Sequence, residues 1–231
     1  MSWLKKNLDI TLFIVLAAIF LIWPELDLWI SGLFYNSEQG FIYRDNAVVE
    51  SIYWLFRHAP KFLLPLLLIM TALSFVKGRF GLGVDQRKQW GFILLTLLIG
   101  PGILVHLVVK ENWDRPRPRQ IQEFDGKKDF IPAFIPAAAI KDQPGNNKSF
   151  VSGHAAMGGW IMIFAWIYRR KSWLYAGIVM GAIVSFGRLL QGGHFFSDLL
   201  FALFFCYFTY RLLAWWLLGY SWIEPEVEPQ K

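Results

Sequence analysis

The sequence has 231 residues, of which 55% are hydrophobic, 18% aromatic and 17% charged, and its net charge is +6. The hydrophobic residues lie in long blocks, so the composition excludes an ordinary soluble domain and favours one integral membrane domain over residues 1–231. The positive residues fall in short clusters between apolar runs, without a nucleic-acid-binding motif, so we expect no nucleic-acid partner. Cys206 is the only cysteine, which excludes an intramolecular disulfide and argues against a thiolate metal site.

The apolar runs predict the fold class. Each is close to the roughly 20 residues that a helix needs to cross a bilayer. They cover residues 8–23, 59–76, 90–109, 154–168, 173–190 and 197–218. We therefore predict an all-α, polytopic bundle of six transmembrane helices. The first run lacks a small-residue cleavage site, so we expect it to be a retained span and not a signal peptide.

The segments outside the runs predict the orientation of the bundle. Lys and Arg at residues 5–6, 77–88 and 169–171 would share one face, which indicates the cytoplasmic side, with both termini there. Residues 24–58 mix charged and aromatic side chains, as expected of a segment lying along the membrane interface, although a plain connecting loop fits almost equally well. Residues 220–231 form a polar tail that we expect to be disordered.

A basic cluster follows the third run. Lys110 ends the run, and Arg115, Arg117 and Arg119 alternate with prolines, whose rings fix φ and stiffen the backbone. A stiff segment can hold a guanidinium group in place for bidentate contact with an oxyanion. A lysine at a span end is as often an interfacial anchor, and periodicity does not decide which arginine points inward.

A second cluster, SFVSGHA at residues 149–155, opens the fourth run. Ser152 and Gly153 stand at an expected helix N-terminus, where free N–H groups and the helix dipole favour an anion. Ser152 also fits a simple N-cap. His154 is unusual here, because a capped apolar helix has no need of an imidazole.

The third cluster is GRLLQGGHFFSD, residues 187–198. His194 and Asp198 are four residues apart, so on a helix they would share a face, and a carboxylate on one ring nitrogen would leave the other free as a nucleophile. Arg188 would face His194 across a tight turn. The alternative is a structural Arg–Asp pair with His194 as a bystander.

These three clusters resemble the three-part signature of the type 2 phosphatidic acid phosphatase (PAP2) superfamily, over residues 110–198. Val151 and Gly187 depart from the proline and serine that the family often has there, without removing a reacting group. The resemblance implies a phosphoric monoester hydrolase that needs no metal or cofactor and acts on a lipid phosphate through a phosphohistidine intermediate. It implies that His194 attacks phosphorus, Asp198 orients it and His154 protonates the leaving group. The implied phosphate ligands are Lys110, Arg117, Ser152, Gly153 and Arg188.

The runs DLWISGLFYNSEQGF and QGGHFFSD and the RPRP element are similar to bacterial lipid A phosphatases of this superfamily. This similarity implies a multi-pass protein of the bacterial inner membrane with its active site facing the periplasm. Phosphatidylglycerophosphate and undecaprenyl diphosphate phosphatases share the same core, and lipid-to-lipid phosphate transfer would use the same intermediate. A lipid-binding protein without catalysis is disfavoured by the intact histidines. His106 and four loop lysines, Lys127, Lys128, Lys141 and Lys148, are weaker candidates for contact with the substrate.

Overall fold

In the computed structural model the chain is described at residues 7–76, 84–136 and 147–223. The longer helices are α2 (Leu8–Ile22), α4 (Ala47–Leu73), α5 (Val84–Leu97), α9 (Lys171–Leu190) and α10 (Phe196–Leu218). The shorter ones are α3 (Leu26–Gly32), α6 (Lys110–Trp113), α7 (Gly153–Gly159) and α8 (Phe164–Tyr168). A π-helical segment, η1 (Leu98–Val109), joins α5 to α6, and the 3₁₀ turns are η2 (Pro118–Gln120), η3 (Gln122–Phe124) and η5 (Trp160–Ile163). Strands β1 (Tyr35–Asn36) and β2 (Gly40–Phe41) form an antiparallel hairpin that pairs Tyr35 with Phe41.

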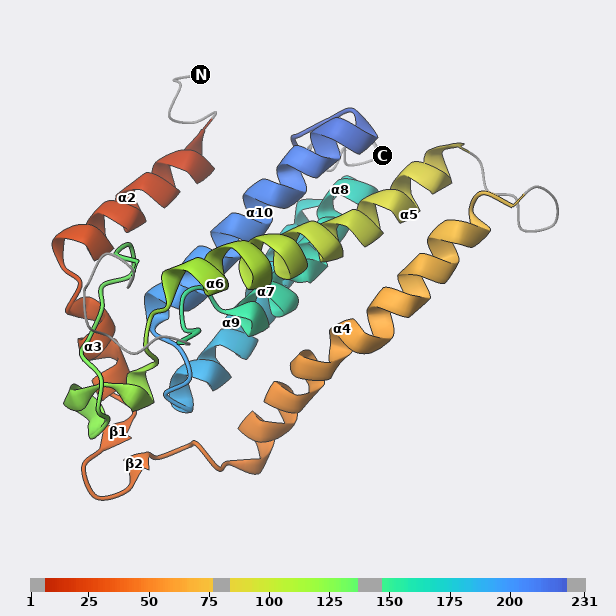
Figure 1. Ribbon diagram of the computed structural model, residues 1–231. Helices are drawn as coiled ribbons and strands as arrows, with labels where there is room; N and C mark the ends of the chain where they lie inside the picture. The colour runs from red at the N-terminus through yellow and green to blue at the C-terminus, as the bar shows by residue number, and fades with distance from the viewer. Residues whose placement is uncertain (1–6, 77–83, 137–146, 224–231) are drawn as a thin grey trace, which may run out of the picture.

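The helices form one elongated bundle. In Figure 1, α2 starts and α10 ends at the upper end, whereas the hairpin, α3 and the turn between α9 and α10 lie at the opposite, lower-left end. The segment from α5 to α6 crosses the bundle between these ends, and α4 lies along α5 and α9. The three sequence clusters are therefore gathered at one end.

The structure confirms the predicted all-α membrane class, but it does not confirm the predicted number of six spans. By length and composition, four helical stretches of the described chain are suited to cross a membrane, or five if α2 and α3 are one bent span. The first predicted run is the 15-residue α2, which ends just before Pro24, and α3 then turns away by 85°. The fourth is interrupted by η5 between α7 and α8, so it is not one continuous helix of spanning length.

The interruption of the fourth run follows from its glycines. A Cβ on Gly158 would lie 3.0 Å from the Cα of Gly181, and one on Gly177 would lie 2.4 Å from the backbone nitrogen of Met162. Small residues thus allow α7 and η5 to approach the backbone of α9 closely, as at membrane helix interfaces. Glycine also weakens helix formation, which favours a change to a tighter turn at this point.

The second predicted run starts much earlier than residue 59. Helix α4 begins at Ala47, because the side chain of Asn46 accepts hydrogen bonds from the N–H groups of Val48 and Val49. Residues 24–58, expected as one interfacial segment or loop, contain α3, the hairpin and the first turns of α4. Pro60 and Pro65 lie inside α4 without ending it.

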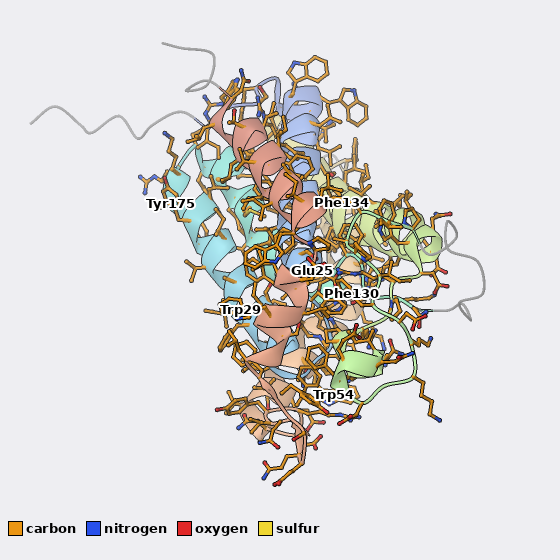
Figure 2. The ribbon with its side chains drawn as sticks, turned by 90° about the vertical axis from the view of Figure 1, so that its left-hand side faces the viewer. Glu25, Trp29, Trp54, Phe130, Phe134 and Tyr175 are labelled. Atoms are coloured by element: carbon orange, nitrogen blue, oxygen red, sulfur yellow. The ribbon has the colours of Figure 1, made fainter. Side chains whose placement is uncertain are left out.

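The outer surface of the bundle is apolar. Large side chains such as Trp29 and Tyr175 are exposed on α3 and α9 (Figure 2). An apolar exterior of this extent is expected where lipid, and not water, surrounds a helix bundle. Some residues used in the orientation prediction, namely 5–6, 77 and 79, fall outside the described residues, as do Lys141 and residues 224–231 of the polar tail.

Candidate active site

The structure brings together the side chains that the sequence predicted for the site. Lys110 begins α6, Arg188 lies in the last turn of α9, and His194 lies in the turn before α10. All three are buried, whereas Arg117 and His154 are partly exposed. The convergence of separate segments at one end of the bundle agrees with the sequence prediction.

The ring of His194 is held by main chain. Its Nδ1 lies 2.8 Å from the carbonyl oxygen of Ser149. A carbonyl oxygen only accepts hydrogen bonds, so Nδ1 carries the proton and donates it. The neutral ring therefore has its lone pair on Nε2, the nitrogen that is free to attack an electrophile.

Asp198 acts on His194 less directly than the four-residue spacing suggested. Helix α10 begins at Phe196, so His194 precedes the helix and does not share a helical face with Asp198. The Oδ2 atom of Asp198 lies 3.6 Å from Nδ1 of His194, too far for a hydrogen bond. Instead it accepts hydrogen bonds from the N–H of Phe195 at 2.8 Å and from Oγ of Ser149 at 2.5 Å. Asp198 thus fixes Ser149, and the carbonyl of Ser149 orients His194.

Arg115 resolves which arginine of the RPRP segment points into the protein. Its fully buried guanidinium lies 2.6 Å from Oδ1 of Asp198 and 2.8 Å from Oδ2 of Asp27. It also donates to the carbonyl of Ile131 and to Oγ of Ser197, at 2.7 and 2.9 Å. Arg115 therefore links the N-terminal helix α3 to the start of α10, behind His194.

The other cations surround His194. Burial lowers the pKa of His194 well below its usual value, and the charges of Arg188, Arg117 and Lys110 lower it further, in that order. The hydrogen bond to the carbonyl of Ser149 opposes this effect. Burial and the surrounding cations therefore favour a neutral ring, the state required of a nucleophile.

His154 lies in the first turn of α7, against a side chain that sequence reasoning missed. Its ring stacks on Tyr53 of α4, with ring centroids 4.7 Å apart and planes inclined by 19°. The guanidinium of Arg188 lies over the same tyrosine ring, 4.7 Å from its centroid. Nε2 of His154 is buried and has no hydrogen-bond partner among the described residues. This nitrogen is available to a bound molecule.

The Ser152–Gly153 pair shapes the start of α7. Ser152 is the N-cap, since its Oγ accepts from the N–H of Ala155 at 3.3 Å, so the expected capping role is present. A Cβ on Gly153 would lie 2.6 Å from Nε2 of His106 and 3.4 Å from Nζ of Lys110. Gly153 therefore leaves room for both side chains, and His106, a weaker candidate, lies beside the site.

Arg188 is held by the turn that follows it. Its Nη1 donates a hydrogen bond to Oε1 of Gln191. A Cβ on Gly193 would lie 2.3 Å from its Nη2, so only glycine admits the guanidinium at this position. The turn QGG thus positions the cation as well as reversing the chain.

A cavity of about 170 Å³ opens beside Arg188. Its lining is mostly charged and comprises Arg44, Asp45, Glu50, Tyr53, Arg117, Arg119, Arg188 and Gln191. His194 does not line it, so the nucleophile lies deeper than this opening. The described residues contain no cluster of three or more His, Cys, Asp or Glu side chains that could hold a metal ion.

Two of the weaker loop candidates have protein partners. Lys148 forms an exposed ion pair with Glu111 at 2.6 Å, and Lys128 donates a hydrogen bond to Asn147. Asp27, Tyr53 and Ser149 were not predicted. A single sequence carries no periodic or spacing signal that connects Asp27 and Tyr53 with clusters more than fifty residues away.

Comparison with known proteins finds three similar curated relatives. The chain is similar to a lipid A 4'-phosphatase of Francisella tularensis subsp. novicida, with 37% identity over 195 residues that cover 82% of this chain and 85% of that protein. It is also similar to a lipid A 4'-phosphatase of Rhizobium leguminosarum, with 31% identity over 79% of this chain and 83% of the relative. A third, of Rhizobium etli, shares 29% identity over 79% of this chain and 76% of its own length. No solved structure matches the chain.

The family model for the PAP2 superfamily matches residues 90–222, a range that contains all three clusters and every phosphate ligand predicted from the sequence. The chain belongs to the PAP2 superfamily.

Proposed function

We propose that the protein hydrolyses a phosphate monoester of lipid A, at the 4' position named for its relatives. The observation that carries this proposal is the neutral His194, held through Nδ1 with three cations around it. A nucleophile in a cationic environment suits a phosphate dianion better than a neutral ester or an amide.

In the first step, Nε2 of His194 attacks phosphorus. A P–N bond forms, the P–O bond to the sugar breaks, and the products are a phosphohistidine and a sugar alkoxide. His154 donates a proton to this alkoxide, for which its unpaired Nε2 is suited. Burial opposes protonation of His154 most, and the charges of Arg188, Lys110 and Arg117 add to it; the incoming dianion offsets the part due to these cations and so favours a protonated ring.

In the second step, the now neutral His154 takes a proton from water. The resulting hydroxide attacks phosphorus, the P–N bond breaks, and inorganic phosphate leaves with its added oxygen. His194 returns to its neutral state with the proton on Nδ1, because the carbonyl of Ser149 has held that proton throughout.

Lys110, Arg117 and Arg188 are proposed to bind the phosphoryl oxygens, together with the hydroxyl of Ser152 and the N–H of Gly153. Phosphoryl transfer depends mainly on positioning and on stabilisation of charge, which fixed cations can supply. We therefore expect no metal requirement, and a chelator should leave the rate unchanged.

We further propose that all 231 residues form one domain of the bacterial inner membrane, crossing it six times, with the site facing the periplasm and the termini facing the cytoplasm. The basic residues Arg169 and Arg170 lie between α8 and α9, and Lys171 begins α9, at the end away from Arg188, which supports this orientation. In a Cys206→Ala background, single cysteines introduced at Lys127 and at Lys171 test it. An impermeant thiol reagent added to whole spheroplasts should label the first and not the second; the reverse pattern contradicts the proposed orientation.

Phosphate release from purified lipid A tests the activity. His194→Ala should abolish release, whereas His58→Ala, which removes an exposed histidine stacked on Trp54, should retain it. Mass spectrometry of the lipid product should show loss of one phosphate from the 4' position. Release that survives in His194→Ala rejects the mechanism.

The same assay separates the alternatives. Phosphatidylglycerophosphate, phosphatidic acid and undecaprenyl diphosphate should be poorer substrates than lipid A; a higher kcat/KM on any of them replaces the proposed substrate. Labelled phosphate that appears on an added acceptor lipid, with little free phosphate, identifies a phosphotransferase.

A further inference from the structure

The cavity beside Arg188 contains more positive charge than the proposed reaction uses. Of its four arginines, Arg117 and Arg188 are assigned to the phosphate that is cleaved. Arg44, from the loop before α4, and Arg119, from η2, have no part in that chemistry. Both residues line the cavity from segments outside the long helices.

These two arginines add to the positive charge of the cavity. Asp45 and Glu50 also line the cavity, so four positive and two negative side chains face it. Within the part of the chain that the structure describes, neither Arg44 nor Arg119 forms an ion pair with a carboxylate. Glu50 instead accepts a hydrogen bond from the indole of Trp54. The cavity therefore keeps a surplus of positive charge.

Main-chain contacts hold both arginines at this position. The N–H of Arg119 donates to the carbonyl of Gly192 at 3.2 Å, and the carbonyl of Arg44 accepts from Nε2 of Gln191 at 3.4 Å. The partners Gly192 and Gln191 belong to the turn Gln191-Gly192-Gly193, which directly precedes His194. The backbones of Arg44 and Arg119 are thus tied to the turn directly before His194, so both side chains start from positions beside the site.

We propose that the part of this cavity lined by Arg44 and Arg119 is a second anion subsite, which binds a phosphate or carboxylate group carried on the sugar headgroup of the same lipid whose phosphate is cleaved. The proposal rests on the proposed function. The volume of about 170 Å³ is far larger than the roughly 10–15 Å³ that one water molecule needs, so a hydrated oxyanion fits. Guanidinium groups bind phosphate and carboxylate oxygens in the same bidentate manner, so either group can be the ligand.

Measurement of KM and kcat on three forms of lipid A tests the subsite. The assay uses a neutral detergent, so that the substrate supplies the only lipid anions. The first form carries only the phosphate that is cleaved, the second carries a further phosphate, and the third carries acidic sugars. The variants are Arg44→Gln and Arg119→Gln, whose main-chain contacts with the turn are retained. Lys127→Gln is the matched control, since it removes an exposed positive charge that does not line the cavity.

The wild-type protein should have a lower KM for a form with a second anion. Arg44→Gln and Arg119→Gln should each raise that KM by about tenfold, the scale of one charge-assisted contact, and leave kcat unchanged. For the form without a second anion, their KM should equal that of the wild type. The form that shows the effect identifies the group as phosphate or carboxylate.

An equal rise in KM on all three forms, or the same rise in Lys127→Gln, overturns the subsite, since either indicates general attraction of anions. An unchanged KM in both arginine variants also overturns it. None of these results affects the proposed function, which fails separately if His194→Ala remains active.

Discussion

Arg115 offers a direct test of how the site is held together. Arg115→Met removes a fully buried guanidinium and leaves the carboxylates of Asp27 and Asp198 without their common cation. Removing one partner of a buried ion pair typically costs about 3–5 kcal/mol, because the remaining charge is desolvated and unpaired. We expect a loss of at least this size in the free energy of unfolding, since two carboxylates are affected.

The matched control is the exposed pair of Lys148 and Glu111, whose side chains are 39% and 52% exposed. Because solvent screens such a pair, Lys148→Gln should cost only about 0–1 kcal/mol. Unfolding of both variants would be followed by circular dichroism in mixed micelles with increasing denaturing detergent. A loss below about 1 kcal/mol for Arg115→Met would refute the inference that the buried pairs stabilise the fold.

The same variant separates positioning from stability. Arg115 fixes Asp198, and Asp198 accepts a hydrogen bond from Ser149, whose carbonyl orients His194. At a temperature where the variant is still folded, kcat should fall more than KM rises. Arg115→Lys should recover part of the stability and little of kcat, because an ammonium group cannot contact both carboxylates in the same geometry. Equal recovery of both would argue that the role is structural alone.

Four other outcomes are expected. Gly193→Ala should lower kcat about 100-fold, because the new Cβ displaces the guanidinium of Arg188; wild-type kinetics would show that the position of Arg188 is unimportant. Since burial and the nearby cations hold the pKa of His194 well below its usual value, the acid limb of kcat/KM should follow the substrate phosphate, which gains a proton at about pH 6, and should keep its position in Lys110→Gln; a limb that moves to higher pH in Lys110→Gln would show that His194 sets it. His194 should also lower the free energy of unfolding as pH falls below about 6.5, because the unfolded chain then binds a proton that the folded chain does not. A midpoint of unfolding that depends on pH between 5 and 7 in the same way in the wild type and in His194→Gln argues against this. Vanadate should inhibit the wild type and inhibit Arg188→Lys more weakly, because five-coordinate vanadate on His194 resembles the transition state; equal inhibition counts against Arg188 as a ligand.

The sequence was informative where chemistry and spacing coincide. The motif residues Lys110, Arg188 and His194 needed no long-range information, because cations, imidazoles and carboxylates are costly to place in an apolar chain without a task. Runs of apolar residues likewise predicted the helices α9 and α10 closely, since a long uninterrupted helix is the main way to satisfy backbone hydrogen bonds in a membrane. The roles assigned to these side chains remain predictions.

The sequence was less informative where tertiary contacts decide. The broken fourth run depends on how closely Gly158 approaches Gly181, which hydropathy does not report. The contact of Asp198 with His194 depends on the turn before α10: His194 lies off the helix, which begins at Phe196, and the direct hydrogen bond is replaced by one to Ser149. Asp27 and Tyr53 lie in a segment whose pattern fits a loop almost equally well, and only the fold places Asp27 against Arg115 and Tyr53 against His154.

The burial of Asp27 against Arg115 has a consequence for the limits of the functional unit. The family match begins at residue 90, yet a carboxylate from α3 neutralises the guanidinium behind the nucleophile, and Tyr53 of α4 stacks on His154. A fragment trimmed to the matched region would keep every signature residue, but Arg115 would retain only Asp198 of its two carboxylates, and Ser197 would lose its hydrogen bonds to Asp27. Exchanging this N-terminal portion between relatives therefore transfers part of the catalytic scaffold and not merely a membrane anchor.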